Sequence, residues 1–230
     1  MTGEELKLCI QFAPHVLFDK KEPFDIKHIG CTVFSGRAPS PSFPGSPLKR
    51  RIIDPVAKHA ALAVEYAYSY DYDIQHLYEL EHVWVYIAAD GTVCGCEGSF
   101  HGKYLNQMIP LFPVLDKGKT QVTLYAQPGK HAFLPSPQLF ALYPEPDSCC
   151  REKAGSDGLA LPEMFEDAVV LTATQQQEVT DYIRKKYAFT PSWIFEEREL
   201  PSALYVPWQT LAKEIPVRIM KELRKMGVLI

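Results

Sequence analysis

The fold is decided by residues 71–82, which read DYDIQHLYELEH and lead directly into the apolar run from Val83 to Ala88. These twelve positions hold four carboxylates and two imidazoles, and no lysine or arginine occurs between Lys58 and Lys103. Neighbouring carboxylates repel one another unless a cation, an ion pair or a shared proton relieves the repulsion. The segment therefore predicts a cation site at the start of a buried strand, with a solvated acidic turn as the alternative.

The spacing of the acidic side chains indicates how they would meet. Side chains alternate along a strand, so Glu79 and Glu81 should face the same way as Val83. Asp73 and His76 precede Glu79 at irregular intervals, which predicts a loop that folds back over the start of the strand. Carboxylates mixed with an imidazole suit Mg²⁺, Ca²⁺, Mn²⁺ or Fe²⁺, whereas Zn²⁺ is disfavoured because no Cys-x-x-Cys pair occurs.

Later segments should bring two more histidines to the same end of this strand. Asp90-Gly91 is a hairpin signal, so residues 92–100 should return antiparallel and place His101 near the acids. A further predicted strand at 121–126 is followed by a turn that gives His131 the same strand-end position. The predicted metal ligands are Asp73, His76, Glu79, Glu81 and His101, and the predicted catalytic groups are Glu81, His101 and His131.

Residue patterns predict a mainly β protein of the α+β class. Tyrosines at every second position from Tyr66 to Tyr72 indicate a strand, and Val83 to Ala88 is apolar on both faces, as in a central strand. We expect an antiparallel β-sandwich with flanking helices. It should form one domain, 1–230, with a sandwich core over about 10–172 and a helical C-terminal extension over about 173–230.

Three helices are predicted from capping residues and apolar periodicity. The first follows the Thr2 capping box, and the second starts at Thr172 or Thr174 and ends near Tyr187. The third runs from about 207 to 226 and should kink or break at Pro216. The basic side chains on this last helix, Arg218, Lys221, Arg224 and Lys225, are interpreted as a solvated face.

Two segments have a structural and a functional interpretation. Residues 35–47 are rich in proline, glycine and serine, so a disordered connector is predicted. The alternative is that this loop forms a lid, in which Phe43 reaches back and covers the acidic site. The alternating tyrosines are interpreted as core packing, with a stacking platform for sugars or bases as the alternative.

Composition excludes some classes of function. A net charge of -4 and a pI near 6.0 favour neither nucleic acid nor an anionic membrane as a partner. The start of the chain is acidic and no run of about 18 apolar residues occurs, so neither a signal peptide nor a transmembrane segment is predicted. We expect a cytoplasmic protein whose six cysteines are free thiols, with a small molecule, glycan or head group as its ligand.

Three motifs give the chain a resemblance to a known superfamily. They are HLYELEHV at 76–83, SFHGKY at 99–104 and GKHA at 129–132, and Phe12-Ala13-Pro14 adds a weaker match. Over residues 10–137 the pattern resembles the superfamily that joins necrosis- and ethylene-inducing-like proteins with vacuolar protein sorting 62-related proteins. The resemblance implies a β-sandwich with a cation site at one end.

The resemblance also implies roles for individual residues. His76 and Glu79 would be direct ligands, Glu81 and His101 would hold metal-bound water, and Asp73 or Asp71 would complete the site. Glu79 stands where the family motif has aspartate, and Tyr78 where it has a second histidine, so the identity of the cation stays open. The membrane lysis and sphingolipid binding of the toxin branch are not carried over, because that branch is secreted and disulfide-bonded.

Three functions fit these predictions. The first is a metal-assisted hydrolase of glycosidic or phosphate ester bonds, with Glu81 or His131 as the general base. The second is a non-catalytic module that binds a carbohydrate or lipid head group through the cation and the tyrosines. The third is a purely structural role, in which the cation only holds the ends of the strands together.

Overall fold

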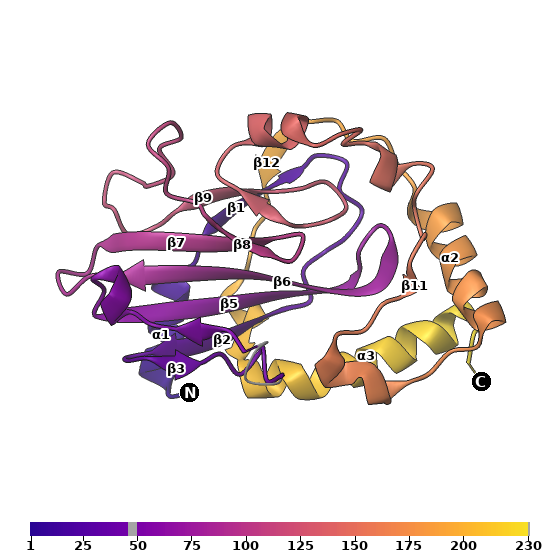
Figure 1. Cartoon of the computed structure of the whole chain (residues 1–230), viewed down its shortest axis with the longest axis horizontal. Coiled ribbons are helices and arrows are strands. Elements are labelled where there is room, and N and C mark those ends of the chain that lie inside the picture. Colours follow the sequence, from indigo (N-terminus) through magenta and orange to yellow (C-terminus); the bar gives the residue numbers. More distant parts are fainter. Residues whose placement is uncertain (46–49, 230) are drawn as a thin grey trace.

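Two β-sheets share one hydrophobic core in the computed structural model, which describes residues 1–45 and 50–229 (Figure 1). The larger sheet has the order β13-β2-β5-β6-β7-β8, with β11 paired to β6, and the smaller one has the order β10-β9-β1-β12. Helices α2 and α3 pack beside each other at one end (Figure 1).

The bounds of the elements follow from backbone pairing. The larger sheet contains β2 (His28–Phe34), β5 (Leu62–Tyr72), β6 (His76–Ile87), β7 (Val93–Phe100), β8 (Lys103–Asn106), β11 (Gly158–Leu159) and β13 (Tyr205–Pro207). The smaller sheet contains β1 (His15–Asp19), β9 (Thr123–Ala126), β10 (Phe133–Leu134) and β12 (Phe195–Glu197), and a separate pair joins β3 (Ala38–Pro39) to β4 (Ile52–Ile53). The α-helices are α1 (Gly3–Gln11), α2 (Ala173–Tyr187) and α3 (Trp208–Met226), and the 3₁₀ turns are η1 (Val56–Lys58), η2 (Pro137–Leu142), η3 (Ser148–Cys150), η4 (Glu163–Ala168) and η5 (Ser202–Leu204).

The mainly β, sandwich-like α+β fold is confirmed. The predicted hairpin forms, because β6 and β7 pair antiparallel from Val83↔Gly98 onward. The sheets are mixed, however, because β1 pairs parallel to β9, β13 to β2 and β11 to β6. These parallel pairings join strands far apart in the sequence, which local patterns do not reveal.

The tyrosine face of β5 lies inside the core. Tyr66, Tyr68 and Tyr70 are at most 1% exposed, and the ring centroid of Tyr68 is 5.2 Å from that of Phe133 in the opposite sheet. Core packing is therefore confirmed. The alternative of a ligand-stacking platform is wrong, because no ligand can reach these rings without separating the sheets.

The predicted capping box of Thr2 with Glu5 forms on α1, and Thr172, one of the two predicted caps of α2, forms a capping box with Gln175. Helix α3 continues through Pro216 as one helix, so the predicted break does not occur. Four of its apolar side chains are at most 2% exposed, namely Leu211, Ile215, Ile219 and Leu223. The free energy gained by burying them offsets the loss of the backbone hydrogen bond that proline cannot make.

Among the described residues, no helix combines the length and apolarity needed to cross a bilayer.

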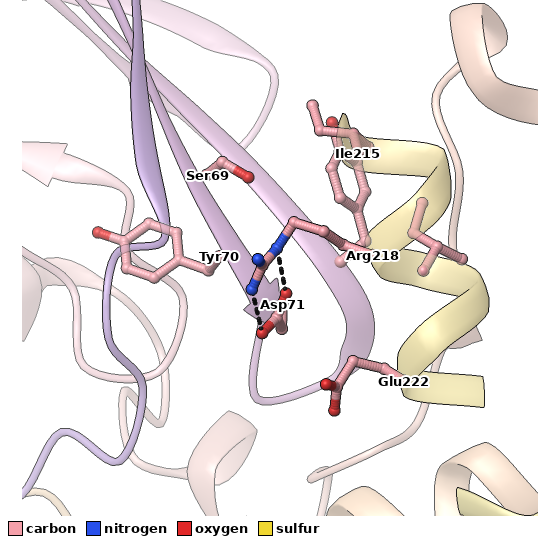
Figure 2. Close-up of a pocket in the computed structure, with 8 residues that line it drawn as sticks. Ser69, Tyr70, Asp71, Ile215, Arg218 and Glu222 are labelled. Atoms are coloured by element: carbon pink, nitrogen blue, oxygen red, sulfur yellow. Dashed lines mark hydrogen bonds and ion pairs between the residues drawn. The ribbon is translucent and has the colours of Figure 1, made fainter. Parts of the chain in front are cut away.

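Helix α3 is tied to the larger sheet by a bidentate ion pair (Figure 2). Arg218 donates from Nε and from a terminal nitrogen to the two carboxylate oxygens of Asp71, at 2.9 and 2.8 Å. Close by, Tyr72 donates its hydroxyl proton to Glu222 on the same helix. The interpretation of the basic residues as a purely solvated face is therefore wrong for Arg218.

Residues 35–45 are ordered against the outer face of the larger sheet, so the prediction of a disordered connector is wrong for them. Positions 46 and 47 of the predicted connector lie outside the described residues. Ser42 donates to Glu65 at 2.8 Å, and Trp84 donates to the other oxygen of the same carboxylate at 2.7 Å. The Arg51 guanidinium stacks 3.7 Å from the Trp84 ring centroid. These polar contacts order a segment that has few apolar side chains of its own.

Replacing Arg218 with alanine should lower the free energy of unfolding by about 1–3 kcal/mol, because it removes two charge-assisted hydrogen bonds and leaves the largely buried Asp71 carboxylate with only the more distant ammonium of Lys27, at 3.9 Å. Denaturant titration measures this change. Lys221→Ala, at an exposed position on the same helix, is the control and should change stability by less than about 0.5 kcal/mol. Equal effects of the two substitutions would contradict a docking role for Arg218.

Candidate metal centre

The turn between β5 and β6 directs the Asp73 side chain inward. Asp73 N–H donates to the His76 carbonyl at 2.9 Å, and Gln75 N–H donates to Asp73 Oδ1 at 2.5 Å. Ile74, fully buried, donates its N–H to the Gly129 carbonyl at 2.8 Å. Asp73 thus lies on the predicted loop, while His76 is already the first residue of β6.

Three potential ligand atoms converge at this turn. His76 Nε2 lies 3.9 Å from Asp73 Oδ2 and 3.7 Å from Glu79 Oε2, and one ligand atom from each residue fits within a 4.8 Å group. Two atoms that are each about 2.3 Å from one ion lie about 3.3–3.8 Å apart at right or tetrahedral angles. His76 Nδ1 is buried without a hydrogen-bond partner, whereas Asp73 Oδ2 is already paired with an ammonium group. The three side chains therefore fit a single divalent cation.

Lys130 supplies a countercharge that the sequence did not reveal. Its Nζ lies 2.6 Å from Asp73 Oδ2, and it comes from the loop after β9. The absence of nearby basic residues in the sequence therefore does not mean that the acids lack a cationic partner. The GKHA motif contained this lysine, but no local pattern paired it with Asp73. A divalent cation in the group would compete with the ammonium for this oxygen.

The acids differ in their proton affinity. Burial raises the pKa of Glu79 well above its ordinary value, and the charges of Asp73 and Glu81 add to the effect. Burial also raises the pKa of Glu81, to about 7, although a hydrogen bond from Ser99 opposes it. Burial acts in the same direction on Asp73, but His76 and Lys130 outweigh it and lower the pKa of that carboxyl. Without a metal, Asp73 therefore loses its proton more readily than Glu79 does.

Glu81 and His101 lie beside the three-residue group. Ser99 Oγ donates to Glu81 Oε2, which joins the end of β7 to β6. His101 and Gly102 form the two-residue turn between β7 and β8, with φ values of 47° and 74°. His101 Nε2 is hydrogen-bonded to Gln127 at 2.7 Å, and burial lowers the pKa of the imidazole. The hairpin thus brings His101 to the predicted end of the strand, where its Nε2 is bonded to an amide.

His131 lies elsewhere, in the core between the sheets. It is fully buried, its ring stacks on Tyr70 with a centroid distance of 3.8 Å, and its Nε2 is 3.3 Å from Glu22. Glu22 also accepts a hydrogen bond from Gly129 N–H at 2.6 Å. The structure therefore places His131 away from the group formed by Asp73, His76 and Glu79.

A pocket of about 420 Å³ opens beside this group. The polar residues His76, Glu79, Glu81 and Ser99 line part of it. Phe43, Tyr104, Leu161 and Met164 add apolar surface to the lining. Phe43 packs on His82 with a centroid distance of 4.7 Å and lines the same pocket as Glu79 and Glu81, while its role as a lid over the acids stays a prediction. The part contributed by residues 160–164 had no signal in the sequence.

Comparisons with known proteins give little further information. No family model matches the sequence, and no curated protein matches it. One solved structure, Necrosis and Ethylene inducing Protein 2 from the causal agent of cocoa's witches' broom disease, aligns over 57% of this chain and 68% of its own, with 20% identity and a TM-score of 0.34. A similarity this weak establishes neither a common fold nor a common function, so the membership of the superfamily stays a prediction.

In the presence of a chelator, the free energy of unfolding should fall as the pH rises from 4.5 through about 7, because folded Glu81 holds its proton more tightly than the unfolded chain does. Glu79 contributes in the same direction. Glu81→Gln should remove its share, at most about 3 kcal/mol, and flatten the profile. Denaturant titrations at several pH values measure this, with Glu196→Gln at an exposed position as the control. A Glu81→Gln profile parallel to that of the wild type would contradict the raised pKa.

Proposed function

We propose that the protein binds a divalent cation through Asp73, His76 and Glu79 and that this cation anchors a small ligand in the adjoining pocket. The convergence of the three ligand atoms is the observation that carries the proposal. Two carboxylates and one imidazole suit Mg²⁺, Ca²⁺, Mn²⁺ or Fe²⁺ better than Zn²⁺, which prefers nitrogen and sulfur ligands in closed sites. A bound ion would supply Lewis acidity and an attachment point for ligand oxygens.

The pocket favours a ligand with both hydroxyl groups and an apolar face. The carboxylates in its lining can accept hydrogen bonds from hydroxyls, whereas Phe43 and Tyr104 offer aromatic surface. A carbohydrate or a lipid head group has these properties. The buried tyrosines of β5 cannot take part, so the aromatic contacts come from the 35–45 segment and from β8 instead.

Metal-assisted hydrolysis is the second candidate, and the pKa of Glu81 favours it. A carboxyl with a pKa of about 7 can both accept and donate a proton at neutral pH, which general acid–base catalysis requires. Glu81 lines the pocket next to Glu79, so it can exchange a proton with a bound ligand. Ser99 holds one of its oxygens in place and leaves the other for this exchange. We propose no catalytic role for His131, because of its burial.

Calorimetric titration with Mg²⁺, Ca²⁺ and Mn²⁺ tests the metal site. Asp73→Asn and Glu79→Gln should each weaken binding about tenfold or more, because each removes one ligand charge. Lys130→Met should strengthen binding about tenfold or more, because it removes an ammonium 2.6 Å from Asp73 Oδ2. Glu196→Gln is the control and should bind as the wild type does.

The outcomes separate the metal site from an acidic ion-pair cluster. If no ion binds the wild type, or if Lys130→Met weakens binding as the ligand substitutions do, the proposed site is wrong. If the ion raises the melting temperature but leaves ligand binding unchanged, the cation is purely structural.

Assays with bound metal distinguish binding from hydrolysis. A binding module should retain glycans on an array, or head groups on vesicles, in a chelator-sensitive manner and form no product. A hydrolase should turn over at least one chromogenic ester, glycoside or phosphate, and Glu81→Gln should lower its turnover about 100-fold or more while changing metal affinity less than about threefold. An equal loss of metal affinity in this variant would assign Glu81 to the metal rather than to proton transfer.

A further inference from the structure

Two adjacent cysteines lie behind the loop that carries Lys130. Cys149 and Cys150 are consecutive in η3, and their sulfur atoms are 3.6 Å apart. Cys149 is half-buried, whereas Cys150 is fully buried. The pair therefore consists of one thiol that solvent can reach and one thiol held directly behind it.

The buried thiol packs tightly against the loop from Gln127 to His131. Cys150 donates its S–H to the Pro128 carbonyl at 3.2 Å. A Cβ added to Gly129 would lie 3.1 Å from Cys150 Sγ and 2.8 Å from the Ile74 side chain, so no space remains between η3 and this loop. The next residue is Lys130, the ammonium partner of Asp73.

The half-buried thiol lies in surroundings that favour its reactive form. Its hydrogen-bonded contact with the Cys150 sulfur, with the nearby Lys130 as a smaller influence, holds the pKa of Cys149 below its ordinary value, although burial and Asp73 oppose this. The hydrogen bond with Cys149, together with burial, raises the pKa of Cys150. Oxidation-sensitive cysteines typically combine access, thiolate character and a second thiol within reach.

We propose that Cys149 and Cys150 are a reversible redox pair: a hydroperoxide oxidises Cys149, Cys150 closes a disulfide with it, and closure loosens the Gln127–His131 loop. The pair stands whether or not the acidic group binds a cation. Its consequence for the loop follows from the contacts of Cys150 with Pro128 and Gly129.

The chemistry balances with the hydroperoxide as the oxidant. The Cys149 thiolate attacks one peroxide oxygen, the O–O bond breaks, and the leaving oxygen takes up the thiol proton, which leaves Cys149 as a sulfenic acid. Cys150 sulfur then attacks the sulfenic sulfur, so that an S–S bond forms and the S–O bond breaks. The departing hydroxide takes the Cys150 proton and leaves as water. Two thiols together lose two electrons and two protons, and the peroxide is reduced.

A disulfide between neighbouring residues is strained, which suits it to reversible regulation rather than to permanent stabilisation of the fold. Cα atoms across a trans peptide are about 3.8 Å apart, whereas disulfides usually join Cα atoms about 4.4–6.8 Å apart. Closure must therefore distort η3, where Cys150 N–H donates to the Asp147 carbonyl at 3.0 Å. Strained disulfides are readily reduced.

Closure also removes a contact that holds the loop. The Cys150 sulfur loses the proton that it donates to Pro128 and moves toward Cys149. The loop then keeps the hydrogen bond between Ile74 N–H and the Gly129 carbonyl, but loses the packing behind it. Backbone amides of the loop, including His131 N–H bonded to Gln127, should open more often.

Peptide mapping of the full chain after hydrogen peroxide treatment and alkylation tests the pair. The peptide with residues 149 and 150 should lose about 2 Da, escape alkylation and recover both thiols with dithiothreitol. Cys149→Ser should abolish this product, whereas Cys94→Ser, at an exposed cysteine on β7, should behave as the wild type. Hydrogen exchange at residues 127–131 should become about fivefold faster or more in the oxidised wild type, but not in peroxide-treated Cys149→Ser.

The alternative results are separable in the same samples. Two free thiols after treatment, irreversible oxidation of Cys149 without a disulfide, or a bond between other cysteines such as buried Cys9 and Cys31 would overturn the redox pair. Formation of the disulfide with unchanged exchange at 127–131 would overturn the coupling to the loop.

Discussion

The acidic end of the molecule depends on the pairing of Lys130 with the buried carboxylate of Asp73. Asp73 follows β5 of the larger sheet and Lys130 follows β9 of the smaller one, so this contact joins the ends of the two sheets. The hydrogen bond between Ile74 and Gly129 runs alongside it. Without an ammonium or a metal ion at this point, an ionised Asp73 would face Glu79 in a buried site and would rely on His76 to offset its charge.

The pocket exists because β6 lacks a strand partner along part of one edge. Among the described residues, β11 pairs with β6 only as far as Leu77, and β7 begins its pairing at Val83. Between these points the backbone faces an opening rather than a neighbouring strand, and Glu79 and Glu81 line the pocket there. The segment with Phe43 covers the other side. An interrupted sheet edge thus provides both the acids and the access that a binding site requires.

Local patterns predicted the parts of the molecule that local physics determines. Alternation predicted the common face of Glu79 and Glu81, and capping residues predicted the starts of α1 and α2. The turn signal at Asp90-Gly91 predicted the hairpin that brings Ser99 to Glu81. Each of these features depends on residues a few positions apart or on one hairpin.

The features that the sequence did not reveal depend on distant partners. Lys130 meets Asp73, Arg218 meets Asp71, and β11 joins β6 only because tertiary packing brings these segments together. The same packing turned His131 into the core beside Glu22. The opposite pKa shifts of Asp73 and Glu79 have one more consequence. A divalent ion that enters this site competes with a proton for the Glu79 carboxylate, so the acidity of the surroundings sets how readily the ion is held.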